Sequence, residues 1–133
     1  MFYSIEKKEY GIRIAFEGML DEENARKYVA EFLPVLNSMV GEFGIIMDLT
    51  KAKPMPEASQ VIVNEAYKAV LQKKGMNRSA SIVSSPTMKM QMVRLAKERG
   101  VYDTTRYIDI ETSADYEKAA VDWVAGGIDP DLG

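Results

Sequence analysis

The chain has 133 residues, of which 47% are hydrophobic and 28% are charged, and its formal net charge is −3. These values are typical of one globular domain, and they argue against a disordered chain. Because the chain contains no cysteine and no histidine, disulfides, thiolate or histidine metal sites and nucleophiles activated by histidine are excluded.

The charge is unevenly distributed along the chain. Residues 67–107 carry 9 basic and 2 acidic side chains, whereas residues 1–66 and 108–133 are both acidic overall. A basic segment of this kind could meet an acidic protein, anionic lipid or nucleic acid, although a solvated helix face is the simpler explanation. Because aromatic residues are not interleaved with the basic ones, we expect no nucleic-acid partner.

The first predicted elements are two strands that form a hairpin. Residues 3–5 begin the first strand, and Ile12, Ile14 and Phe16 alternate with other residues in the second. The turn between them lies at residues 9–11, where a glycine ends the link. An antiparallel pair is therefore expected at the start of the fold.

Helices and strands alternate in the rest of the chain. After Gly18, acidic residues at 21–23 and apolar residues at three-to-four spacing predict a helix. Residues 44–49 form a continuous apolar run, which is typical of a central strand covered on both faces. The elements expected after it are a helix over residues 57–74, a strand over 79–83, a helix over 86–99, a strand over 104–108, and a helix opened by Thr112 and Ser113.

The predicted order is therefore β-β-α-β-α-β-α-β-α. This order indicates an α/β fold in a single domain, with a mostly parallel sheet of about five strands, an N-terminal antiparallel hairpin and four helices. We expect the domain to cover residues 1–125, with residues 126–133 as a loose C-terminal tail. The start of the sequence lacks the apolar region of a signal peptide, and no apolar run reaches the ~20 residues that span a bilayer. We therefore expect a cytoplasmic protein without a membrane span.

Two burial predictions follow from helical spacing. Trp123 shares a helix face with Ala119, Ala120 and Val124, so we expect it to be buried against the sheet. Met90 lies off the apolar face of the preceding helix, so we expect it to be exposed.

Four stretches carry a family resemblance. Residues 14–21 end in Gly-Met-Leu-Asp, residues 45–50 end in Asp-Leu-Thr, residues 84–101 run from Ser-Ser-Pro to Gly-Val, and residues 108–124 contain paired alanines. In order and spacing they resemble the STAS domains and the wider SpoIIAA-like group, the anti-sigma-factor-antagonist fold. The resemblance covers roughly residues 3–124 and implies a bacterial regulatory module that binds another protein.

The chain departs from that family at its best-known motif. Members of the antagonist type carry Asp-Ser-Ser-Gly at the start of the second helix, and the first serine is phosphorylated. Counting from Asp48, the matching residues are Pro56, Glu57, Ala58 and Ser59. Glu57 thus occupies the phosphorylated position, and we expect no phosphoserine switch there. In this respect the chain resembles the more divergent SpoIIAA-like proteins. Some of those proteins share features with lipid-binding Sec14-type modules.

The candidate site lies where the third and fourth strands end. Ligands of open α/β sheets bind at the carboxyl ends of parallel strands, and the following helix N-termini offer free N–H groups. An alternative is that the polar residues there only cap helices and hold turns. The predicted partner- or ligand-binding residues are Asp48, Thr50, Lys53, Glu57, Ser59 and Ser85.

The leading functional hypothesis is a non-enzymatic regulatory or protein-interaction module. Its expected partner is another protein, with a homodimer as an alternative, and we expect no catalytic residue, metal or cofactor. A second hypothesis is a carrier of a small apolar or lipid-like ligand in a pocket between helices and sheet. The third is a carboxylate enzyme, which is disfavoured because histidine is absent and no catalytic pair stands out.

Overall fold

A computed structural model describes residues 2–132 and contains the predicted order of elements. The strands are β1 (Tyr3–Lys8), β2 (Gly11–Gly18), β3 (Phe43–Ala52), β4 (Met76–Val83) and β5 (Thr105–Asp109). The helices are α1 (Glu22–Asn37), α2 (Glu57–Lys73), α3 (Pro86–Glu98) and α4 (Tyr116–Gly126), and a short 3-10 helix (Tyr102–Thr104) precedes β5. The α/β fold class is confirmed. Within residues 2–132, none of the helices combines the length and the apolar character needed to cross a membrane.

The strands form one sheet in the order β1-β2-β3-β4-β5. β1 pairs antiparallel with β2, and every other neighbouring pair is parallel. The hairpin and β3 approach each other closely at Gly11, where a Cβ atom would lie 2.0 Å from the carbonyl oxygen of Gly44. Gly11 also has a φ of +145°, so only glycine suits this junction.

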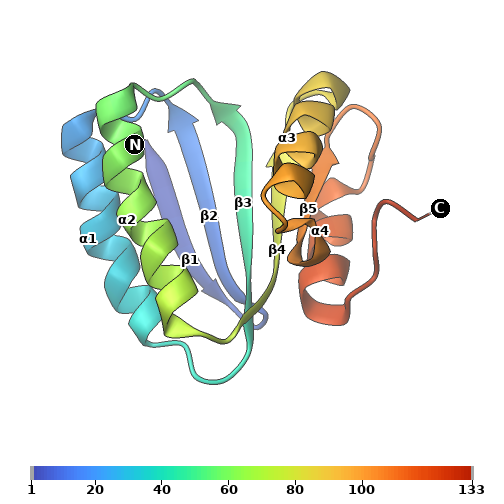
Figure 1. Cartoon of the computed structure of the whole chain (residues 1–133), viewed down its shortest axis with the longest axis horizontal. Helices are drawn as coiled ribbons and strands as arrows, with labels where there is room; N and C mark the ends of the chain where they lie inside the picture. The colour runs from blue at the N-terminus through green and yellow to red at the C-terminus, as the bar shows by residue number, and fades with distance from the viewer. Residues whose placement is uncertain (1, 133) are drawn as a thin grey trace.

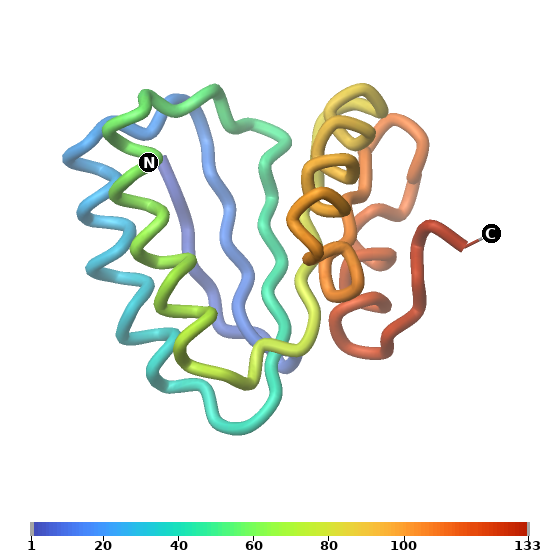
Figure 2. Tube along the Cα trace, in the orientation of Figure 1, coloured from blue at the N-terminus to red at the C-terminus, as the bar shows by residue number. Residues whose placement is uncertain are grey.

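Helices cover the sheet in two groups (Figures 1 and 2). α1 and α2 lie side by side over one face, while α3 and α4 lie at the β4–β5 end. The alternation in β2 turns Ile12, Ile14 and Phe16 toward α1 and α2, where they join Tyr28 and Phe32 in a first core. Because α4 packs on β3, β4 and β5 of the other face, the neighbouring part of that face over β1 and β2 stays open.

A second core lies between α4 and the sheet. It joins Ile46, Ala80, Ile82 and Ile108 of the strands to residues of α4. Trp123 is 6% exposed, and its Nε1 donates a hydrogen bond of 2.9 Å to the Ser79 carbonyl. The predicted burial of this ring is confirmed.

Three element boundaries differ from the prediction. β4 begins at Met76 rather than at residue 79. β3 continues to Ala52 because its pairing with β2 extends through Glu17 and Gly18, so Thr50 lies in a strand rather than in a loop. α4 begins at Tyr116 rather than near Thr112. The carboxylate of Asp109 accepts hydrogen bonds from the backbone N–H and the hydroxyl of Thr112, at 2.8 and 2.6 Å, which hold a turn there.

The residues after α4 contact the domain. Gly127, with a φ of +69°, ends the helix. Arg106 of β5 then pairs with Asp129, and Lys89 of α3 pairs with Asp131. The segment that we expected to be a loose tail is thus tied to β5 and α3 through residue 131.

Candidate functional site

An ion-pair cluster lies where α4 meets the open part of the sheet. Arg13 of β2 donates to the Asp48 carboxylate of β3 at 3.1 Å, and to Glu117 from the first turn of α4. The parallel register brings Arg13 and Asp48 together, because Asp48 lies opposite Ala15 and Arg13 lies two residues before Ala15 on the same strand. The cluster therefore ties β2, β3 and α4 to one another.

Asp48 is held in its ionised form. Thr50 donates to Asp48 Oδ1 through its backbone N–H at 3.0 Å and through its hydroxyl at 2.6 Å. Partial burial opposes ionisation, but the hydrogen bonds from Thr50 and Arg13 outweigh it and lower the pKa of Asp48. The hydrogen bond to Glu117 outweighs burial at Arg13 and raises the pKa of that guanidinium. Neither Arg13 nor Asp48 is suited to exchange a proton near neutral pH.

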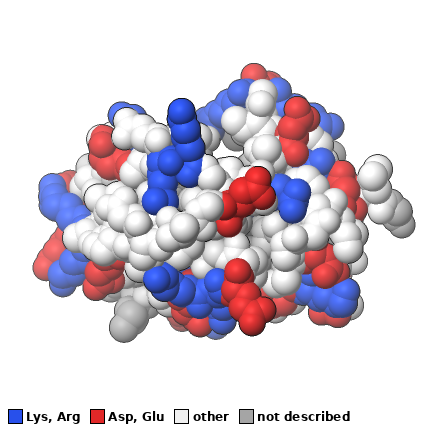
Figure 3. Space-filling model, turned by 90° about the horizontal axis from the view of Figure 1, so that it is seen from below, with Lys and Arg blue, Asp and Glu red and all other residues white. Residues whose placement is uncertain are grey.

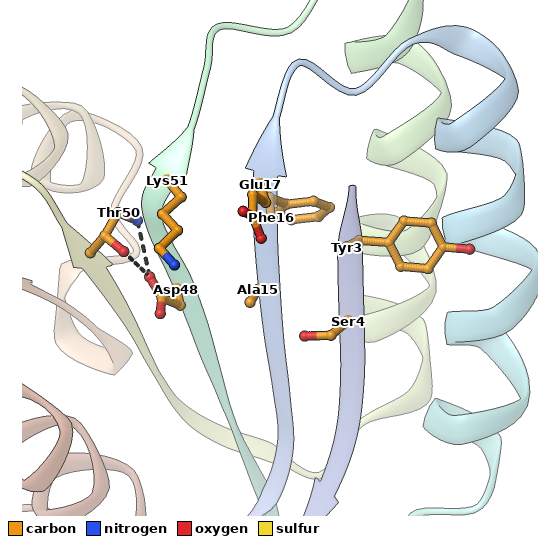
Figure 4. Close-up of a pocket in the computed structure, with 8 residues that line it drawn as sticks. All are labelled: Tyr3, Ser4, Ala15, Phe16, Glu17, Asp48, Thr50 and Lys51. Carbon is orange, nitrogen blue, oxygen red and sulfur yellow. Dashed lines mark hydrogen bonds between the residues drawn. The ribbon is translucent and has the colours of Figure 1, made fainter. Parts of the chain in front are cut away.

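A shallow pocket lies beside this cluster, at the carboxyl ends of β2 and β3 (Figure 4). Its volume is about 200 Å³, which is below the roughly 300–1,000 Å³ of ordinary ligand pockets. The register places Ser4, Ala15 and Asp48 in one row across its floor. The lining residues are Tyr3, Ser4, Ala15, Phe16, Glu17, Asp48, Thr50 and Lys51. This part of the sheet is better described as a polar surface than as an enclosed site.

The six predicted site residues differ in their burial and in their hydrogen bonds. Asp48 and Thr50 are half-buried and contact each other. Lys53 and Glu57 are exposed, Lys53 just after β3 and Glu57 as the first residue of α2. Ser85 caps α3, where its hydroxyl accepts a hydrogen bond of 3.2 Å from the Met88 N–H.

Ser59 lies beneath the surface. Its side chain is fully buried, and its hydroxyl has no hydrogen-bond partner among residues 2–132. Within the same residues, no hydrogen bond or ion pair connects the side chains of Lys53, Glu57 and Ser85. The structure thus brings Asp48 and Thr50 together and leaves Lys53 and Glu57 as the exposed charged members of the set.

Sequence reasoning missed Arg13 and Glu117. Arg13 had one local signal, since it is a long cationic side chain in the alternating pattern of β2. Its partner Glu117 is 104 residues away, so no local pattern connects the two. Over residues 2–132, no group of three acidic side chains is arranged to hold a metal ion.

Comparisons with known proteins find similar structures but no match to the sequence. Neither a protein-family profile nor a curated protein matches the sequence. An uncharacterized protein of the DUF3478 family with a SpoIIAA-like fold, from Shewanella loihica, matches with a TM-score of 0.62 and 16% identity over 92% of this chain and 91% of its own. The unphosphorylated anti-sigma factor antagonist SpoIIAA matches with a TM-score of 0.62 and 19% identity over 93% of this chain and 98% of its own. The chain therefore has the SpoIIAA-like fold that its sequence resembles.

Proposed function

We propose that this chain is a non-enzymatic regulatory module that binds another protein at the carboxyl edge of its parallel strands. One structural neighbour is named as an anti-sigma factor antagonist, a name that describes action against another protein. Fold likeness alone leaves the partner open. The residues of this edge must therefore identify the binding surface.

The observation that carries the proposal is the uncapped, exposed start of α2. Pro56 occupies the cap position and makes no side-chain hydrogen bond to the helix. The first N–H groups of a helix lack partners inside the helix, so a docking protein can supply the acceptors. Exposed Lys53 and Glu57 flank this helix start with opposite charges, which can orient a partner.

The chemistry of the chain supports a binding role over catalysis. Histidine and cysteine are absent, which removes the commonest general base and the strongest neutral-pH nucleophile. The pKa of Asp48 is lowered by its hydrogen bonds, so this carboxylate stays ionised at neutral pH. A polar surface of fixed charges is suited to recognising another surface.

Charge reversal at this edge tests the proposal. Glu57→Lys and Lys53→Glu should each change stability by less than ~0.5 kcal/mol, because both side chains are exposed. Affinity capture from the native cells, with quantitative mass spectrometry, should show at least about tenfold lower recovery of the specific partner, which corresponds to ~1.4 kcal/mol. If both variants recover the same proteins as the wild type, this edge is not the binding surface.

Matched controls are available at the opposite edge of the sheet. Glu42→Lys and Lys74→Glu reverse the same two charges at exposed positions before β3 and after α2. Figure 3 views the molecule from that side and shows positive and negative side chains interspersed over a largely uncharged surface. These variants should recover the partner as the wild type does.

A second candidate function is the carriage of a small apolar ligand. The observation that favours it is a cavity of about 150 Å³ between α2 and the sheet, lined mainly by apolar side chains such as Phe32, Ile45, Val63 and Val70. Cavities of this size accept a benzene-sized molecule, whereas larger ligands need roughly 300 Å³ or more. Solvent extraction of the purified protein followed by mass spectrometry separates the two functions, because a carrier would release a stoichiometric small molecule.

A further inference from the structure

A groove along α3 is lined by cations of the basic segment 67–107, and the proposed function does not involve this groove. The groove lies between α3 and residues 129–132 and has a volume of about 750 Å³. Lys89, Arg94 and Lys97 line it from one helix, with Met90 and Val93 between them. We call this surface the α3 groove.

One end of the α3 groove already binds a carboxylate of the chain itself. Lys89 Nζ donates to Asp131 Oδ1 at 2.9 Å, and the Tyr102 hydroxyl donates to the other oxygen of the same carboxylate. Just behind it, Arg106 donates to both oxygens of Asp129 at 2.8 and 3.0 Å. These contacts show that side chains from α3 and β5 bind carboxylates of the turn at residues 129–132.

The other end of the α3 groove keeps unsatisfied positive charge. Arg94 and Lys97 are exposed and make no ion pair within residues 2–132, although Lys97 Nζ lies 4.8 Å from the centre of the Tyr102 ring and Glu98 lines the same groove. Their positions three residues apart on one helix make them neighbours, so their charges repel each other unless an anion lies between them. Met90, 72% exposed, adds an apolar surface beside them that an aliphatic side chain could cover.

We propose that the α3 groove binds an acidic, extended segment of a partner protein. Carboxylates of that segment pair with Arg94 and Lys97, while an apolar side chain between them contacts Met90 and Val93. Carboxylates of the partner thus bind cations of α3 in the same way that Asp131 of the chain binds Lys89. Because Asp131 holds Lys89, it also competes with the partner for that cation and weakens binding.

The lining of the α3 groove disfavours nucleic acid as the occupant. Tyr102 is its one aromatic lining residue, whereas single-stranded nucleic acids are held by successive stacked bases. The lining carries three cations, Lys89, Arg94 and Lys97, and three carboxylates, Glu98, Asp129 and Asp131. Because Lys89 is paired with Asp131 and Asp129 is paired with Arg106, Arg94 and Lys97 are the lining cations that can pair with carboxylates of a partner.

Fluorescence anisotropy with a defined probe tests this proposal on the whole chain. The probe is a labelled peptide Glu-Leu-Glu-Asp-Leu-Glu, and its neutral counterpart is Gln-Leu-Gln-Asn-Leu-Gln. The acidic probe should bind at least about tenfold more tightly than the neutral one at low salt, and added salt should weaken it. Arg94→Glu with Lys97→Glu should reduce its affinity at least about tenfold, whereas Asp131→Asn should raise it about threefold by releasing Lys89.

The control pair Lys68→Glu with Lys74→Glu makes the same change in net charge at exposed positions on and after α2. This pair should retain wild-type affinity for the probe. Equal losses in the two double variants, equal binding of the acidic and neutral peptides, or tighter binding of single-stranded oligouridine would overturn the proposal. Circular dichroism confirms that each variant is folded. Because Lys53 and Glu57 do not line the α3 groove, a negative result here leaves the proposal for the carboxyl edge untouched.

Discussion

Replacement of Trp123 by alanine tests the second core directly. The ring is 6% exposed and packs against Arg106, whose guanidinium lies 4.4 Å from the ring centre. Removing a buried tryptophan costs roughly 3–5 kcal/mol, and losing the hydrogen bond to the Ser79 carbonyl adds ~1 kcal/mol. This is a large part of the roughly 5–15 kcal/mol that stabilises a domain.

Thermal and urea unfolding, followed by circular dichroism, measure this loss. For a chain of this length, the melting temperature should fall by roughly 10–20 °C. Trp123→Phe keeps a six-membered aromatic ring but removes the N–H donor and the rest of the pyrrole ring, so its cost should be smaller, nearer ~1–2 kcal/mol. A loss below ~1 kcal/mol for Trp123→Ala would refute the inference that this ring holds α4 on the sheet.

Three further predictions concern single side chains. The pKa of Asp48 is lowered in the folded state from its ordinary value of 3.8, so its contribution to stability is present above that value and lost as pH falls through the folded pKa. Asp48→Asn should therefore show a weaker fall of unfolding free energy below pH 4 than the wild type in urea titrations, and identical slopes would contradict the reasoning. Because Ser59 is fully buried, intact-mass and phosphopeptide analysis of protein from native cells should find no phosphate on it, and stoichiometric phosphate there would count against the buried placement. Ser85→Ala should destabilise the protein by ~1 kcal/mol through loss of the α3 cap, whereas exposed Ser84→Ala should change little in the same unfolding assay.

Local patterns predicted the elements of this fold because each element carries its own signal. The alternation of Ile12, Ile14 and Phe16 identified β2, and the apolar run after Gly44 identified the centre of β3. The end of β3 could not be read in the same way. Thr50 and Lys51 are polar, and the strand continues through them to Ala52 because Glu17 and Gly18 of β2 pair with Lys51 and Ala52.

The candidate site was predicted less completely than the fold. The ion pair between Arg13 and Glu117 depends on where α4 packs, which no local spacing encodes. Burial of Ser59 did have a local signal, since it shares helical spacing with Val63, Ala66 and Val70 on the inner side of α2. Ser59 therefore lies on the apolar face of α2. Its residue type instead suggested an exposed helix cap, because serine is common at that position.

Photo-crosslinking in the native cells tests most directly whether a partner protein binds at the carboxyl edge. A photoreactive amino acid placed at position 57 or 53 should form a covalent adduct with the same heterologous protein, because both positions lie at the exposed carboxyl edge. The same group at position 42, on the opposite edge, should form no such adduct. Adducts at position 42 that match those at 53 and 57, or their absence at 53 and 57 while the protein is folded and expressed, would contradict the account.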